Sequence, residues 1–430
     1  MPRTRLGRVV SLALLLGLLA ACDRTALNHG PAGRHLHVVG PWVGDEQASF
    51  MAMVKPWEDR TGNTVDYEAS RDLNALLTAR VQAGTPPDLA GLAGSGQMAE
   101  LATNGTLLPL DKVVDLSRLK ADYGQPWLRL ATVNGKLVGI FIKVAIEGMI
   151  FYDPTTLASA GLDFGTPPPT WTAMTAATQQ IESATHAAAW CIGVESGPAS
   201  GWPGADWIRD FYLRQAGPAR YERWAAGQEP WTSPEMKAAW QSFGALVHSP
   251  TLTYGGIPYV LSTNFATAFR PMFTSPPGCY LYHQASFLTE DFKNLQPVPD
   301  VNAVGFPDID PRYHGAQVVE ADLFGMLKDS AEARDLLRYL TTAEAQQIWV
   351  KRGGAVSANQ QVSLDAYPNP LLRQAARLVV AASPPEFDLV DAASTAQQTA
   401  FFKGVVRYIA QPDQLDAILA DLEKIRVKGN

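Results

Sequence analysis

The stretch from residue 37 to residue 72, HVVGPWVGDEQASFMAMVKPWEDRTGNTVDYEASRD, decides the fold. A strand ends before Gly40, and a helix begins behind Gly44, where acidic side chains favour a helix N-terminus. Four apolar residues then recur at the spacing of one helix face: Phe50, Met53, Val54 and Trp57. Pro56 is expected to kink or break this helix because it supplies no backbone donor. A second strand follows through Val65 and Tyr67. In such a unit both loops leave the carboxyl ends of parallel strands, where open α/β sheets bind ligands.

These two loops supply the first candidate ligand-binding residues. Trp42 follows the first strand and offers a flat apolar ring, whereas Asp45 and Glu46 offer carboxylates at the start of the helix. Arg71 and Asp72 follow the second strand and begin the next helix. Aromatic rings can contact the apolar faces of a ligand, and charged, fork-shaped groups can bond its polar rim.

Composition and the N-terminus limit the class of protein. The chain has 430 residues, enough for two domains, and a formal net charge of −7 without a basic run, which argues against binding of nucleic acid. Residues 1–21 read as a secretory signal, with arginines before a short apolar segment. The segment ends in LAAC and resembles a lipoprotein box, which would place a lipid anchor on Cys22; the alternative is an ordinary signal peptide with a chance cysteine. Residues 22–35 are then a flexible tether.

Several tracts in order resemble family 1 extracellular solute-binding proteins, the receptors of bacterial ABC-type sugar importers. The tracts are KPWEDRTGNTVDYEASRD, AGTPPDLAGLAGSGQMAELATNGTLLPLD and GTPPPTWTAM. YEASRD, CIGVESG, GCYLYHQASF and GGAVSAN are similar to the alpha-glucoside-binding branch of this maltose-binding-protein-like family.

The resemblance implies an α/β fold of two lobes, the type II periplasmic-binding-protein-like fold, each lobe an open, mostly parallel sheet flanked by helices. It places residues 36–145 and 313–352 in the N-lobe, and residues 146–312 and 353–430 in the C-lobe. It further implies a carbohydrate ligand in the cleft, transmembrane permease subunits as partners, and a place on the outer face of the cytoplasmic membrane. We expect a monomer without a cofactor or metal.

The three expected crossings between lobes carry charged candidates. The run LVGIFIKVAIEGMIFY fits two strands in tandem, and the family places Lys143 near this first crossing; the alternative is a solvated strand charge. Glu320 and Asp322 in VVEADLFGML lie two apart on a strand and so point to one face, which the family turns toward the cleft. Arg352 begins the last crossing.

Four further candidates are weaker. Ser95 lies in a glycine loop that either approaches a ligand or simply enters a helix. Trp202, in a Gly- and Pro-rich loop, is expected to be a ligand platform, and Asn264 lies in the STNFATAFRPMF stretch. His283 ends a strand and either bonds a ligand hydroxyl or is a satisfied structural residue.

The remaining cysteines indicate a crosslink. Cys191 and Cys279 form an even pair in an exported chain, which favours a disulfide over two separate buried thiols. A metal site is not expected, since neither cysteine has histidines at ligand spacing.

Two functions fit these residues. The first is a lipid-anchored, non-catalytic receptor that captures a carbohydrate, an alpha-glucoside or another oligosaccharide, and delivers it to a permease. The alternative is an exported glycan-active hydrolase in which Glu320 and Asp322 are an acid/base pair. Catalytic carboxylates of glycosidases usually face each other from different elements, which favours binding. The chain also has few clusters of cations, which argues against phosphorylated ligands.

Overall fold

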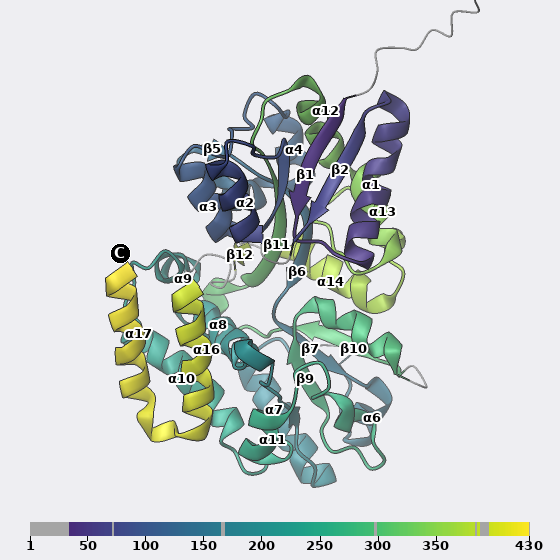
Figure 1. Cartoon of the computed structure of the whole chain (residues 1–430). Helices are drawn as coiled ribbons and strands as arrows, with labels where there is room; N and C mark the ends of the chain where they lie inside the picture. Colours follow the sequence, from purple (N-terminus) through teal and green to yellow (C-terminus); the bar gives the residue numbers. More distant parts are fainter. Residues whose placement is uncertain are drawn as a thin grey trace, which may run out of the picture.

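The computed structural model describes residues 34–70, 73–164, 168–295, 299–382, 385–387 and 395–429. In these residues the chain forms two separate sheets of six and four strands, each flanked by helices, and a two-stranded ribbon. Figure 1 shows the six-stranded sheet with its helices above the four-stranded sheet, with β6 and β11 descending from the upper part toward the lower. The molecule is therefore a two-lobed α/β protein, as predicted.

The first sheet has the order β12-β11-β3-β1-β2, and β6 also pairs with β11. Its strands are β1 (His35–Gly40), β2 (Thr64–Ala69), β3 (Leu89–Ala93), β6 (Ile140–Ile146), β11 (Gln317–Met326) and β12 (Pro385–Phe387). β1 pairs in parallel with β2 and β3, whereas β11 runs antiparallel to β3 and β6. The opening strand–helix–strand unit is thus built as the sequence predicts.

Helix α1 (Asp45–Thr61) shows how the apolar stripe positions the first lobe. It buries Phe50, Met53, Val54 and Trp57, the predicted face, and packs against α12 (Ala331–Leu340) and α13 (Ala343–Arg352). The prediction of a break at Pro56 is wrong, because the helix continues through it. Trp57 follows immediately, and its buried ring donates from Nε1 to the Asp335 carboxylate of α12 over 2.8 Å, which holds this turn in place.

The remaining first-lobe elements are shorter and cover the sheet. They are α2 (Leu73–Gln82), α3 (Ser95–Thr103), α4 (Leu116–Tyr123), α5 (Gln125–Leu130), β4 (Thr132–Val133) and β5 (Lys136–Leu137).

The second sheet has the order β10-β7-β9-β8. Its strands are β7 (Met149–Tyr152), β8 (Trp190–Cys191), β9 (Leu281–Gln284) and β10 (Asn302–Gly305). β7 is antiparallel to both neighbours, and only β8 and β9 are parallel, so the sheet is mixed rather than mostly parallel. β7 follows β6 after two residues, and this short connection carries the chain from the first sheet to the second.

Helices surround this second sheet. They are α6 (Pro154–Ser159), α7 (Trp171–Thr185), α8 (Trp202–Ala216), α9 (Pro218–Ala225), α10 (Pro234–Val247), α11 (Gly256–Ser262), α16 (Thr395–Ala410) and α17 (Leu415–Gly429). The short 3-10 helices of this half are η1 (Gly197–Ala199), η2 (Arg270–Phe273), η3 (Ser286–Asn294) and η4 (Pro311–Tyr313). Two more lie near the C-terminal part, η5 (Leu364–Ala366) and η6 (Pro412–Gln414).

The chain crosses between the two sheets and returns. β6 leads to β7 through Glu147 and Gly148, and β10 leads to β11 after η4. After α13, helix α14 (Pro370–Ala381) contacts both β6 and β10 and so lies between the sheets. β12 then pairs with β11 in the first sheet, although residues beyond 353 were expected in the second lobe. The open edge of β11 at Gln317–Val319 offers the backbone partners that β12 uses.

A disulfide joins Cys191 of β8 to Cys279, just before β9, with their Cα atoms 5.5 Å apart. It therefore connects two neighbouring strands of the second sheet. In the described part of the chain, no helix has both the length and the apolar character needed to cross a membrane.

Candidate functional site

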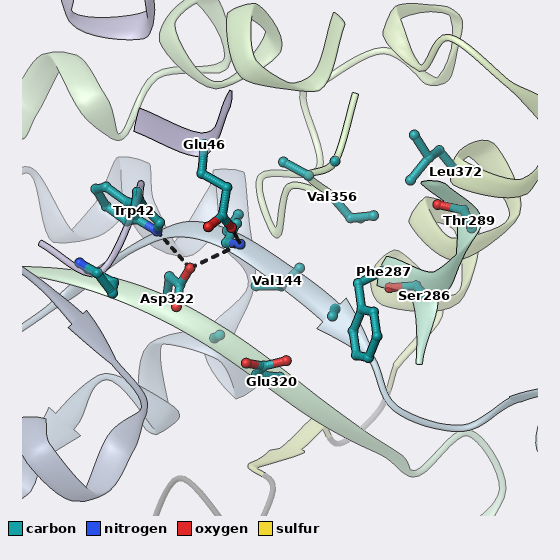
Figure 2. A pocket seen from close by; sticks show the side chains of 16 residues that line it. Trp42, Glu46, Val144, Ser286, Phe287, Thr289, Glu320, Asp322, Val356 and Leu372 are labelled. Carbon is teal, nitrogen blue, oxygen red and sulfur yellow. Dashed lines mark hydrogen bonds and ion pairs between the residues drawn. The ribbon is translucent and has the colours of Figure 1, made fainter. Parts of the chain in front are cut away.

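A cavity of about 320 Å³ lies between strands β6 and β11 of the first sheet and the segments η3 and α14. Its first wall consists of residues from the loop after β1, the start of α1, and strands β6 and β11. Its second wall comes from η3, the loop after α13, and α14. The residues that line it are Pro41, Trp42, Glu46, Lys143, Val144, Ala145, Ser286, Phe287, Thr289, Glu320, Ala321, Asp322, Gly354, Ala355, Val356 and Leu372. Figure 2 shows the carboxylates of Glu46 and Asp322 together beside Trp42, and Phe287 and Leu372 farther along.

The polar end is built around Lys143. Lys143 on β6 and Asp322 on β11 are directly opposite each other in the antiparallel register, so their side chains leave the same face. The Lys143 Nζ lies 3.3 Å from Asp322 Oδ2 and 2.5 Å from Glu46 Oε1. These contacts join the two central strands to the start of α1, so the first wall is a connected charged network.

The protonation state of Lys143 follows from its neighbours. Partial burial, the largest single effect, lowers the pKa of Lys143, but the carboxylates of Asp322, Glu46 and Glu320 together outweigh it and raise that pKa above the ordinary value. Lys143 is therefore an ammonium at neutral pH, and its positive charge is already matched by carboxylates within the cavity.

Trp42 holds this network rather than offering an open ring face. Its side chain is 1% exposed, and its indole Nε1 donates to Asp322 Oδ2 over 2.8 Å. The rings of Tyr67 and Phe324 stack with it at interplanar angles of 9° and 16°. A Cβ on Gly91 would come within 3.0 Å of the indole, so glycine at that position of β3 makes room for the ring. Trp42 thus lines the cavity but orients the Asp322 carboxylate.

The second wall is mostly uncharged. Phe287 on η3 is 40% exposed, which leaves ring surface available to a ligand. Thr289 is 1% exposed and its hydroxyl has no hydrogen-bond partner among the described residues, whereas the Ser286 hydroxyl accepts from the backbone N–H of Ile146 over 3.2 Å. The exposed Phe287 ring can contact the apolar face of a sugar, whereas the Thr289 hydroxyl oxygen is buried.

Five of the predicted ligand-binding residues line the cavity: Trp42, Glu46, Lys143, Glu320 and Asp322. Glu320 is exposed and lies two residues from Asp322 on β11, so the expectation that both carboxylates point to one face agrees with the structure. Arg71 and Asp72 lie outside the described residues, as does Cys22.

Trp202 does not line the cavity but borders it. It begins helix α8 rather than lying in a loop, and its ring is 4.8 Å from that of Phe265 and 6.1 Å from that of Phe287. Since Phe287 lines the cavity, these three rings form a continuous aromatic cluster that leads away from it.

The other predicted residues lie elsewhere. Asp45 is exposed at the start of α1, and Ser95 begins α3. Arg352 ends α13 and donates from Nε to the Ser49 hydroxyl over 2.9 Å, which joins α13 to α1. Asn264 donates from Nδ2 to Glu195 Oε2 over 2.8 Å.

His283 is part of the interior of the second lobe. It is 3% exposed, its Nε2 lies 2.8 Å from Asp210 Oδ2, and its ring packs 4.2 Å from that of Trp207. Arg214 donates to the same Asp210 carboxylate and to Gln317 at the start of β11, over 2.8 and 2.9 Å. These contacts support the structural alternative for His283.

Sequence reasoning missed the second wall almost entirely. Phe287 and Ser286 belong to the quoted GCYLYHQASF motif and Val356 to GGAVSAN, so the motifs pointed to the right segments without indicating the right residues. Leu372 carries no local signal, because a leucine on an amphipathic helix is typical of ordinary core. The described residues also contain no group of three or more metal-binding side chains.

Comparison with known proteins agrees with this architecture. The profile of the bacterial extracellular solute-binding proteins matches residues 52–375. The chain belongs to this family. It is an exported, envelope-associated protein of the class that serves ABC importers, and the family consists of binding proteins rather than enzymes.

Two curated relatives are similar over nearly their whole length. The osmoprotective compounds-binding protein GgtB of Synechocystis sp. is 30% identical over 407 residues, covering 94% of this chain and 96% of that protein. The alpha-glucosides-binding periplasmic protein AglE of Rhizobium meliloti is 30% identical over 415 residues, covering 94% and 90%.

Solved structures share the fold. The bacterial solute receptor AcbH, described as having an exclusive preference for β-D-galactopyranose, superposes with a TM-score of 0.80 at 18% identity, covering 92% of this chain and 98% of AcbH. The cyclic alpha-maltosyl-1,6-maltose binding protein of Arthrobacter globiformis has a TM-score of 0.70 at 18% identity, covering 93% and 100%.

Proposed function

We propose that this solute-binding protein captures a small carbohydrate, an alpha-glucoside or a related polyhydroxylated compound, in the cavity between its lobes and delivers it to a membrane permease. The cavity carries this proposal. It places carboxylates beside an exposed aromatic ring, which is the combination that the hydroxyls and the apolar faces of a sugar ring require.

The relatives support the same ligand class. GgtB and AglE bind osmoprotective compounds and alpha-glucosides according to their names, and both are similar over 94% of this chain. A volume of about 320 Å³ is at the lower end of the range for ligand cavities, which favours a ligand of one or two rings over a long oligosaccharide.

The arrangement of the carboxylates fits a protein that binds its ligand without a chemical reaction. Glu320 and Asp322 come from one strand, and Asp322 is engaged by Trp42 and Lys143. Glycosidases place their two carboxyl groups on either side of the scissile bond. The ligand is therefore released unaltered, through opening of the lobes, the movement known for two-lobed binding proteins.

The proposal extends to the anchor and the partners. The LAAC sequence that ends at Cys22 supports lipidation at this cysteine and attachment to the outer face of the cytoplasmic membrane. The protein acts as a monomer, and its macromolecular partner is the permease of an importer.

Calorimetric titration with maltose, trehalose, sucrose and maltotriose tests the proposal, with chromatography of the sugars recovered after each titration. We expect saturable binding of at least one sugar at one site per chain, with the sugar recovered intact. Cleavage of the sugar by the protein alone would support the hydrolase alternative, and failure of every sugar to bind would contradict a carbohydrate ligand.

A further inference from the structure

We infer that the cavity selects its ligand by charge: sugars with a protonated amine bind best, neutral sugars bind next, and sugars with a carboxylate or phosphate are excluded. This inference rests on the proposed carbohydrate-binding function and deepens it by naming the class of sugar. Glu320 is the residue that we assign to this selection.

The charged half of the cavity has an excess of negative charge. Among the described residues, three carboxylates, on Glu46, Glu320 and Asp322, line it with one ammonium, on Lys143, so this described lining carries a formal charge of −2. The ammonium is close to Glu46 and Asp322 at 2.5 and 3.3 Å, and Glu320 also acts on it electrostatically. An anionic ligand would therefore meet a cation whose charge is already matched by three carboxylates.

The other half of the cavity has no positively charged side chain among its described residues that could balance the charge of an anion. Its described lining is formed by Ser286, Phe287, Thr289, Val356, Leu372 and the backbone around Gly354, none of which is cationic. The nearby Arg352 is engaged with Ser49 and is not among the lining residues. Within the described residues, a carboxylate or phosphate has no position in the cavity where an unmatched positive charge would replace its hydration, and burial of an unpaired charge is costly.

Glu320 is the carboxylate best placed to meet a ligand cation. It is exposed, whereas Asp322 is buried and fixed by the Trp42 indole and by Lys143. Figure 2 shows its carboxylate between the charged cluster and Phe287, in the middle of the cavity. A protonated amine beside Glu320 would reduce the negative excess, and nearby charges interact strongly in a partly enclosed site.

The test compares three sugars of one size and shape: glucosamine, glucose and glucuronate. Calorimetric titrations at about pH 6.5 keep the amine protonated and the carboxylate ionised. We expect glucosamine to bind about tenfold or more tightly than glucuronate, with glucose between them. The ratio should shrink when the salt concentration is raised to about 1 M, because salt screens partly exposed charges.

Two matched variants locate the effect. In Glu320→Gln the ratio of glucosamine to glucuronate affinity should fall by about threefold or more, since one of three carboxylates is lost without a change of size. Glu100→Gln makes the same change at an exposed position on α3, outside the cavity, and should leave the ratio unchanged.

Glucuronate binding as tight as glucose, or an unchanged ratio in Glu320→Gln, would overturn charge selection while leaving the proposed function intact. Binding of maltose or trehalose without binding of any of the three monosaccharides would also overturn it. If no sugar binds at all, the proposed function itself fails, and the inference fails with it.

Discussion

At the scale of single residues, Lys143 sets the charge balance of the cavity. Its ammonium separates the carboxylates of Glu46 and Asp322. In Lys143→Met these carboxylates would face each other without a cation, so we expect the free energy of unfolding to fall by roughly 1–3 kcal/mol. Chemical denaturation measures this. Lys55→Met, which removes an exposed lysine paired with Asp59, is the control and should change the free energy of unfolding by less than about 0.5 kcal/mol.

His283 provides a second prediction at the same scale. Because its ring bonds to the buried Asp210 carboxylate, His283→Gln should lower the free energy of unfolding by roughly 1–3 kcal/mol. Its side chain lies away from the cavity, so the affinity of the folded variant for a bound sugar should stay within about twofold of the native value. Denaturation and calorimetry separate the two effects. A stable variant that binds the sugar much more weakly would contradict this prediction and would indicate that His283 belongs to the ligand site.

At the scale of elements, β12 carries a buried titratable group that pairs with α5. Glu386 on β12 is 3% exposed and accepts from Arg129 of α5 over 3.1 Å, while Arg129 also pairs with Glu222 of α9. Burial raises the pKa of Glu386 to about 7, against the opposing effect of Arg129.

A carboxyl whose pKa is raised on folding stabilises the folded state most below its unfolded pKa. This contribution is lost as the pH rises from about 4.5 through about 7, and it amounts to at most about 3 kcal/mol. Glu386→Gln carries no such group. The difference in free energy of unfolding between native and variant protein should therefore shift in favour of the variant as the pH rises over this interval. Denaturation at a series of pH values measures the shift, and a difference that is constant with pH would contradict it.

The disulfide is the second feature at the scale of elements that contributes to stability. It joins residues 88 apart in sequence, and on the chain-entropy model such a loop contributes up to about 4–5 kcal/mol. We expect the double variant Cys191→Ser and Cys279→Ser to lose roughly 2–5 kcal/mol in free energy of unfolding. Sugar affinity of the folded protein should persist, because neither cysteine lines the cavity. Thermal and chemical denaturation, with calorimetry on the same preparation, check both statements.

At the scale of the whole molecule, the sequence predicted the first lobe better than the second. Local signals were strong where one apolar stripe or one turn determines an element, as in α1 and in the tandem strands β6 and β7. They failed at Pro56, where packing of Trp57 outweighs the missing donor, and at β12, whose place depends on an edge supplied by a distant strand. Pairing over long sequence distances leaves no local pattern.

The absence of a local pattern also explains which site residues were predicted and which were missed. Lys143, Glu320 and Asp322 were predicted because the family resemblance places their strands at the crossings between the lobes, facing the cleft. Trp42 was also predicted, but its role changed: the interlocking rings of Tyr67 and Phe324, which only the folded sheet assembles, turn an expected platform into a buried hydrogen-bond donor. Phe287 and Leu372 acquire their importance only from the meeting of two lobes.

The central claim is that both lobes hold one carbohydrate in the cavity between them. Hydrogen-exchange mass spectrometry of the intact protein, with and without a sugar that binds in calorimetry, tests it most directly. We predict slower exchange on sugar binding in three cavity segments together: residues 42–46 after β1, residues 286–289 of η3, and residues 354–356 after α13. Protection of only one wall, or of surfaces outside these segments, would contradict the account.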